Sequence, residues 1–283
     1  AKHKGLSVAL IDKGPIVRSG CAGTGIDHWH STHTSPACKI SPEEATEYYE
    51  KLPLVGAKFG LGHMRYIECT ESYKTLLDLE KWGLPIRDMD DEFEGAPFRD
   101  EKTKLMYAYN YDAKSVVRLR GGALLKPTIA SEVRRLGIDV FEYAMALRFL
   151  NEGGKSGNRV VGVTAMSIRT GEFMIFKAKS VVACGGPTQG VWNAGTELNG
   201  ASNRFLDPCC VGDVQTMIYK AGAEVGNFEF SNKGLSAGGY SYHPYSVGNV
   251  SNTWYGGRMV DANGTLIHYL DEDGNILEEG NLN

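Results

Sequence analysis

Residues 6–13 read Leu-Ser-Val-Ala-Leu-Ile-Asp-Lys, and residues 18–25 read Arg-Ser-Gly-Cys-Ala-Gly-Thr-Gly. The first stretch is a short apolar run, which predicts a β-strand over 6–11 covered on both faces, as in a parallel sheet. In dinucleotide-binding sheets, an acid at the end of such a strand accepts hydrogen bonds from a ribose. A carboxylate suits this role because it only accepts. Asp12 is therefore a candidate ribose ligand, although Asp also favours an ordinary turn.

Two glycine-containing stretches are candidate ligand contacts. The loop 18–25 lets consecutive backbone N–H groups face an anion or a flavin edge. It contains neither a Walker A motif nor GxGxxG, so a plain surface loop is the alternative. Residues 181–186, Val-Val-Ala-Cys-Gly-Gly, predict a buried strand whose exit passes close to a ligand. Cys184 is either a reactive thiol or, as we favour, a small buried apolar residue.

The remaining chain alternates helical and strand patterns. Ser41-Pro42-Glu43-Glu44 predicts a helix start in which Ser41 caps and Glu44 stands three residues on. Further helices are expected over 70–82, 124–136 and 212–221. A small β insertion is expected over 139–178, with strands at 139–143, 146–150, 160–167 and 172–178, and a hairpin over 259–267. Residues 88–104 are charged and broken by Gly and Pro, which indicates an exposed excursion.

Composition narrows the functional classes. The 283 residues are 42% hydrophobic and 23% charged, as in globular proteins, and a formal charge of −4 argues against binding a nucleic-acid backbone. No apolar run reaches the roughly 18 residues that a membrane helix needs. The six cysteines are scattered without a CxxC, which favours reduced thiols in a cytoplasmic setting. A shift in composition near 226–235 divides the chain into domains 1–228 and 229–283.

A histidine cluster supplies the rival hypothesis. His28, His30 and His33 lie close in sequence to Cys38 and Asp27, and clustered imidazoles can bind zinc. Their spacing matches no closed metal site, so solvated or ligand-facing histidines are favoured and no metal ligand is assigned. A metal-dependent hydrolase or binding protein built on this cluster is the alternative function.

The order of these motifs carries a family resemblance. After the strand and glycine loop come KWGLP at 81–85, IFKAKSVVACGG at 175–186, VWNAG at 191–195 and GDVQTMIYKAGAEVGNFEF at 212–230. In that order the chain resembles the flavoprotein subunits of fumarate reductase and succinate dehydrogenase, and most of all the branch containing the adenylylsulfate reductase flavoprotein. The resemblance covers 1–230 well and 231–283 loosely.

The resemblance implies an α/β fold: a doubly wound, Rossmann-like FAD-binding domain with the start of an α+β capping domain. It implies hydride transfer between flavin N5 and a small substrate, and an iron–sulfur electron-transfer partner. Covalently flavinylated members carry His where this chain has Gly20, so non-covalent FAD is expected. The cofactor-binding residues it implies are Asp12, Lys13, Ser19, Gly20, Cys21, Gly23, Thr24, Gly25, Ala146 (by its backbone, at the adenine), Ala183, Cys184, Gly185, Gly186 and Asp213.

The chain also departs from the family pattern. The family's first strand and GxGxxG turn precede the point where this chain begins, and its catalytic arginine follows Asn283. We therefore expect an internal fragment and assign no catalytic residue. A non-catalytic flavin-binding module stays open as a further alternative.

Overall fold

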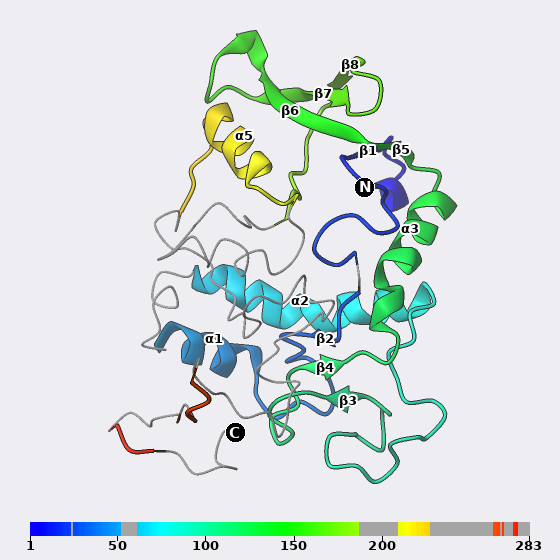
Figure 1. Ribbon diagram of the computed structural model, residues 1–283, viewed down its shortest axis with the longest axis vertical. Helices are drawn as coiled ribbons and strands as arrows, with labels where there is room; N and C mark the ends of the chain where they lie inside the picture. Colours follow the sequence, from blue (N-terminus) through cyan, green and yellow to red (C-terminus); the bar gives the residue numbers. More distant parts are fainter. Residues whose placement is uncertain are drawn as a thin grey trace.

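The computed structural model describes residues 1–23, 25–51, 61–186 and 209–226, with short pieces at 263–266, 268 and 274–276. The elements are β1 (Ala9–Asp12), β2 (His28–Trp29), α1 (Pro42–Lys51), α2 (Gly62–Lys81), β3 (Met106–Tyr107), β4 (Val117–Arg118), α3 (Leu125–Arg135), β5 (Asp139–Glu142), β6 (Ala144–Asn151), β7 (Val160–Ser167), β8 (Phe173–Lys177) and α5 (Asp213–Ala221), with short 3-10 turns at 2–4, 122–124 and 152–154. In Figure 1, α2 crosses the middle of the molecule between two three-stranded sheets, one in the order β6-β7-β8 and one in the order β2-β4-β3.

The first strand is parallel, as predicted. β1 pairs with β5 in a register that runs from Ala9 opposite Asp139 to Asp12 opposite Glu142. The prediction that 6–11 is covered on both faces is wrong, because Leu6 is 59% exposed and β1 begins only at Ala9. Among the described residues, β5 is the one strand that pairs with β1. The opposite edge of β1 forms no ladder hydrogen bonds with any described strand.

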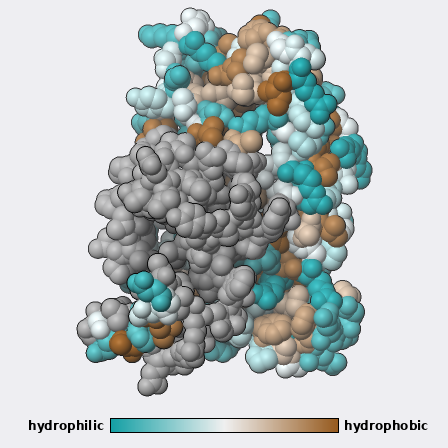
Figure 2. All heavy atoms as spheres, viewed as in Figure 1, coloured by the Kyte–Doolittle hydropathy of each residue, from teal (hydrophilic) through white to brown (hydrophobic). Residues whose placement is uncertain are grey.

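The β insertion is antiparallel and begins at β6. The expected start at residue 139 is wrong, because β5 pairs with β1 in the parallel sheet. Strands β6, β7 and β8 form a sheet in that order, and α5 packs against it (Figure 1). Phe149, Val163 and Met217 form the buried centre of this contact, with Ile11 of β1 beside them. This shared cluster ties the end of β1 to the insertion. Figure 2 shows further hydrophobic side chains on this end of the molecule.

Local capping signals determine several helix ends as predicted. Ser41 Oγ accepts the Glu44 backbone N–H at 3.1 Å, and Glu44 accepts the Ser41 N–H at 2.8 Å, which is a complete capping box. Gly137 and Gly222 follow α3 and α5 with φ of 62° and 93°, where a side chain would be strained. α2 begins at Gly62 instead of residue 70. Its first two turns expose apolar side chains, so the apolar pattern there does not mark a buried face.

The predicted buried strand at 181–184 is wrong. Residues 181–186 form no ladder with any described strand, Val182 is 83% exposed, and Cys184 is exposed and not a buried apolar residue. A run of β-branched residues forms a strand only beside a partner that takes up its backbone hydrogen bonds.

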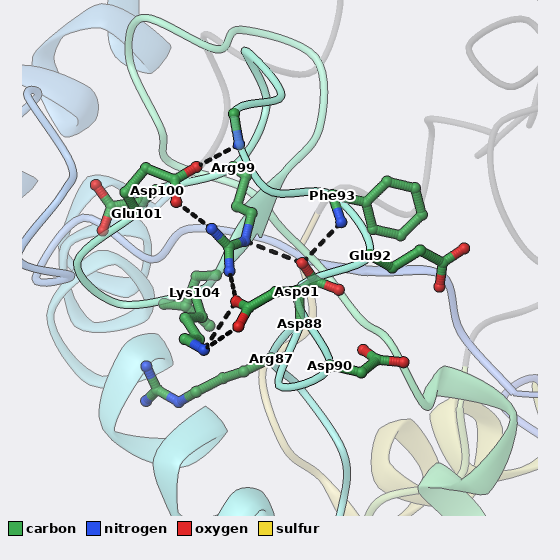
Figure 3. Close-up of polar contacts among 12 residues, drawn as sticks. Arg87, Asp88, Asp90, Asp91, Glu92, Phe93, Arg99, Asp100, Glu101 and Lys104 are labelled. Atoms are coloured by element: carbon green, nitrogen blue, oxygen red, sulfur yellow. Dashed lines mark hydrogen bonds and ion pairs between the residues drawn. The ribbon is translucent and has the colours of Figure 1, made fainter.

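The charged excursion 88–104 is largely exposed, as predicted, but two of its residues, Asp88 and Arg99, are buried and anchor it to the molecule. Arg99 points at the carboxylates of Asp88, Asp91 and Glu101 (Figure 3), and its Nε lies 2.9 Å from Asp88 Oδ2. Asp88 is fully buried and also accepts the Phe93 backbone N–H at 3.0 Å. The excursion is flanked by residues of the larger core, which contains Leu76, Leu79, Leu84, Ile86, Leu105, Tyr107, Val117, Leu119 and Leu125.

Several predicted features lie outside the described residues. They are the segments 191–195 and 227–230, the boundary at 228/229, nearly all of the domain 229–283, and most of the hairpin 259–267.

Candidate functional site

Two carboxylates stand at the carboxyl ends of the parallel strands. Asp12 ends β1 and Glu142 ends β5, directly opposite one another. Asp12 Oδ1 accepts the Gly14 backbone N–H at 2.8 Å, and Glu142 Oε1 accepts the Ile16 N–H at 2.8 Å. The two acids therefore shape the loop that leaves β1. Ligands of open α/β sheets bind outside this edge.

Asp12 keeps hydrogen-bonding capacity for a ligand. Its second oxygen accepts the Ser19 hydroxyl at 2.5 Å, and Lys126 Nζ lies 3.3 Å from the same hydroxyl. A carboxylate has about four lone-pair sites, and these two bonds use half of them. The rest suffice for the two hydroxyls of a ribose. Sequence reasoning missed Glu142 and Lys126; the acid that ends the second strand was the available signal for Glu142.

The glycine loop is compact and is held by its own hydrogen bonds. The Gly23 N–H donates to Gly20 O at 2.9 Å, and a Cβ at Gly23 would collide with Arg18 O. Arg18 Nη1 in turn donates to Gly23 O at 3.2 Å. Gly20 and Gly25 have φ of 75° and 110°, in the region that favours glycine. Thr24, predicted to contact the cofactor, lies outside the described residues.

The segment before α5 closes the other side of this site. Lys13 Nζ lies 2.8 Å from Asp213 Oδ2 and also donates to Cys209 O. Cys21 Sγ of the glycine loop lies 3.8 Å from Cys210 Sγ. The fold thus brings Lys13, Cys21 and Asp213 together across about 200 residues of sequence.

The 181–186 segment also packs against the start of α5. A Cβ at Gly186 would lie 3.3 Å from Cys210 Sγ, and a Cβ at Gly185 would collide with Val214. Gln215 Nε2 donates to Gly186 O at 2.8 Å. Both glycines therefore pass close to the start of α5, although the strand predicted to carry them is absent from the described sheets.

Lys13 and Asp213 form an ion pair at this site. Burial lowers the pKa of Lys13, but the hydrogen bond and the charge of Asp213 outweigh it, so the pKa lies above its ordinary value. Lys13 is therefore a persistent ammonium beside the glycine loop. Both side chains are more than a third exposed, so solvent weakens the pair.

The predicted site residues differ in how closely they gather. Ala146 lies on β6, an edge strand, in the apolar cluster that includes Ile11 next to Asp12. Ala183 and Cys184 are exposed. Lys13, Cys21, Gly185, Gly186 and Asp213 converge on the segment before α5, while Asp12, Ser19, Gly20 and Gly23 form the adjoining loop.

His28 and His33 bond to separate partners. His28 Nδ1 pairs with Asp27, and its Nε2 lies 2.9 Å from the Tyr109 hydroxyl. His33 Nδ1 lies 3.2 Å from Ile40 O, and burial lowers the pKa of His33. Within the part of the chain that the structure describes, no group of three or more His, Cys, Asp and Glu side chains could hold a metal ion. The metal-dependent alternative therefore has no support here.

Comparison with known proteins identifies a family model and a set of similar structures. The model, described as an FAD binding domain, matches residues 1–233. Adenylylsulfate reductase from Archaeoglobus fulgidus is 22% identical, with a TM-score of 0.59, and the match covers 79% of this chain and 32% of that one. The quinol fumarate reductase of E. coli is 16% identical, with a TM-score of 0.54, over 76% and 32% of the two chains.

A flavocytochrome c3 fumarate reductase in an open conformation is 15% identical, with a TM-score of 0.50, over 77% of this chain and 41% of its own. At these identities the likeness concerns the fold. The chain spans about a third of the length of the first two solved chains. No curated protein matches it. None of the helices in the described residues is both long and apolar enough to span a membrane.

Proposed function

Because this chain belongs to the FAD binding domain family and FAD is its cofactor, we propose that it forms the FAD-binding part of an oxidoreductase in which a hydride passes between flavin N5 and a small substrate. The observation that carries this proposal is the convergence of β1, the glycine loop, the two glycines 185–186 and the start of α5 at one edge of the parallel pair. FAD supplies two-electron chemistry at its flavin ring, and the protein supplies orientation and electrostatics.

The residues at this edge have complementary tasks. Asp12 offers its unused lone pairs to the adenosine ribose, and Ser19 holds the carboxylate in place through a hydroxyl bond of 2.5 Å. Gly20 and Gly23 keep side chains out of the path of the pyrophosphate and flavin. Lys13 supplies a positive charge near the phosphates while Asp213 positions it. Ala146 borders the adenine through its backbone, and the segment Ala183 to Gly186 borders the cofactor from the opposite side.

Attachment of the cofactor is proposed to be non-covalent. A covalent flavin bond needs a nucleophilic side chain at the attachment position, and Gly20 has none. Its φ of 75° also belongs to a turn that a larger residue would strain. Flavin is therefore expected in the supernatant after acid denaturation, with no fluorescent band at the protein on a denaturing gel.

The wider assignment rests on the resemblance. We propose a capping domain beginning near residue 229, an iron–sulfur partner that takes up or delivers electrons, and a cytoplasmic setting. The names of the solved neighbours, adenylylsulfate reductase and fumarate reductase, support the redox assignment. The scattered cysteines, none of them in a CxxC motif, support a reducing compartment.

The test is to purify the full-length protein from its source gene and record its visible spectrum before and after denaturation. Released flavin whose mass is that of FAD supports the proposal. Bleaching of the bound flavin by a candidate substrate under anaerobic conditions then supports hydride transfer. A colourless protein that stays colourless after incubation with FAD contradicts the proposal. Bound FAD that no candidate substrate reduces favours the non-catalytic module.

A further inference from the structure

Two thiols from distant parts of the chain meet at the proposed FAD site. Cys21 lies in the glycine loop, and Cys210 lies just before α5, 189 residues later in the sequence. Their sulfur atoms are 3.8 Å apart. Both cysteines carry thiols and are not joined by a disulfide.

We propose that Cys21 and Cys210 form a reversible disulfide that locks the glycine loop onto the segment before α5. Thiols at this separation need a movement of less than about 2 Å to reach the disulfide S–S length of about 2.05 Å. Holding both on one folded chain gives them a high effective concentration, so closure outcompetes reaction with small thiols. Intracellular disulfides that form transiently are commonly redox-sensing, which suits the reducing setting proposed above.

The two cysteines differ in the way that such a pair requires. Cys21 is half-buried and is reached by a small oxidant, whereas Cys210 is 8% exposed and is shielded from it. Because the oxidant reaches the more exposed sulfur first, Cys21 is the attacking thiol and Cys210 the resolving one.

The oxidant we assign is hydrogen peroxide. The Cys21 thiolate attacks one peroxide oxygen, the O–O bond breaks, and Cys21 becomes a sulfenic acid with loss of hydroxide. The Cys210 sulfur then attacks the Cys21 sulfur, the S–O bond breaks, and the hydroxyl leaves as water with a proton. Two thiols have lost two electrons and two protons, and the peroxide has become two molecules of water. A thiol reductant reverses the bond.

The bond has a structural consequence. Gly186 also approaches Cys210, with a Cβ position 3.3 Å from its sulfur, so the disulfide would tie together the loop and the segments that border the cofactor. This consequence rests on the proposed function, whereas formation of the bond does not. Tethering a loop that has to open for exchange is expected to slow FAD release about tenfold.

The test is to treat the full-length protein with peroxide, with and without FAD, to alkylate the remaining thiols and to map the disulfide-linked tryptic peptides. The expected link joins peptide 19–39 to peptide 205–220. Each peptide contains a second cysteine, Cys38 or Cys209, so variants decide the pairing. The link should survive Cys38→Ser and Cys209→Ser, and it should disappear in Cys21→Ser.

Cys210→Ala serves as the second variant, because alanine is tolerated at a buried apolar position better than serine. A link that persists in Cys21→Ser or Cys210→Ala, a link between two chains, or Cys21 that stays fully alkylatable after peroxide would overturn the proposal. The flavin readout is separate. The rate of FAD release should be about tenfold lower for oxidised than for reduced wild-type protein. Oxidation should not change the rate of FAD release from Cys21→Ser. A disulfide that forms without changing the rate of FAD release would overturn only the proposed effect on FAD, and not the disulfide itself.

Discussion

Replacing Asp12 with alanine is expected to weaken FAD binding by about 3 kcal/mol, because two ribose hydrogen bonds to a charged acceptor are lost at about 1.5 kcal/mol each. Asp12 is only half-buried, so solvent keeps each bond at the lower end of the range for charged hydrogen bonds. The Gly14 N–H and the Ser19 hydroxyl occupy one lone pair on each oxygen, which leaves two for the ribose. The dissociation constant should rise roughly 150-fold.

The assay is titration of the FAD-free protein with FAD, followed by quenching of flavin fluorescence. Ser19→Ala removes one bond to Asp12 but no ribose contact, so it should cost about 1 kcal/mol, or roughly fivefold. Asp139→Ala removes an exposed carboxylate at the opposite end of the parallel pair and should leave FAD affinity unchanged. Thermal melting of each FAD-free variant checks that the loop has not simply unfolded.

FMN separates ribose recognition from a general loss of the loop, because FMN lacks the adenosine. If the reasoning is right, Asp12→Ala lowers the affinity for FAD and leaves that for FMN nearly unchanged. An Asp12→Ala protein that binds FAD within about threefold of wild type would refute the assignment. Equal losses for FAD and FMN would show instead that Asp12 only shapes the loop.

Three further outcomes are expected. Gly23→Ala should weaken FAD binding and lower the melting temperature more than Gly20→Ala. A Cβ at Gly23 would collide with backbone, whereas a Cβ at Gly20 meets open space and the substitution costs only about 1 kcal/mol of backbone strain. Equal effects of the two substitutions would contradict this reasoning. Asp88→Asn should destabilise the protein by about 2 kcal/mol in urea unfolding, since Arg99 loses its one buried carboxylate partner while it keeps Asp91 and Glu101. Asp90→Asn, an exposed carboxylate, is its control and should cost under about 1 kcal/mol. Burial lowers the pKa of His33 in the folded state, so the unfolded chain binds its proton first; stability should fall as pH drops below about 6.5, and His33→Gln should flatten that fall in pH-dependent unfolding.

Features encoded by neighbouring residues were predictable from the sequence. The capping box of Ser41 and Glu44 operates over three positions, and both atoms of the motif bond as expected. Gly137 and Gly222 end their helices because only glycine enters the left-handed region without cost. The alternating patterns of 160–167 and 172–178 gave β7 and β8 for a similar reason, since side-chain period is a local property.

Long-range partners could not be predicted in the same way. Nothing in the charge pattern of 88–104 distinguishes buried Arg99 from exposed Lys102, because burial depends on how the excursion packs against the core. The apolar run 181–184 has strong strand propensity, yet the described residues offer it no ladder partner. The family was predictable because it follows from the order of motifs, which survives without any knowledge of contacts.

Residue type, spacing and order were enough to predict the α/β class, several helix ends, an antiparallel β insertion and the FAD family, but not the start of α2. The contact of Cys21 with Cys210, the pair of Lys13 with Asp213 and the position of Glu142 opposite Asp12 could be seen only in the folded chain. These partners lie far apart along the chain. Contacts between residues more than a hundred positions apart arise when whole elements pack, and that packing is set by the sum of many weak interactions.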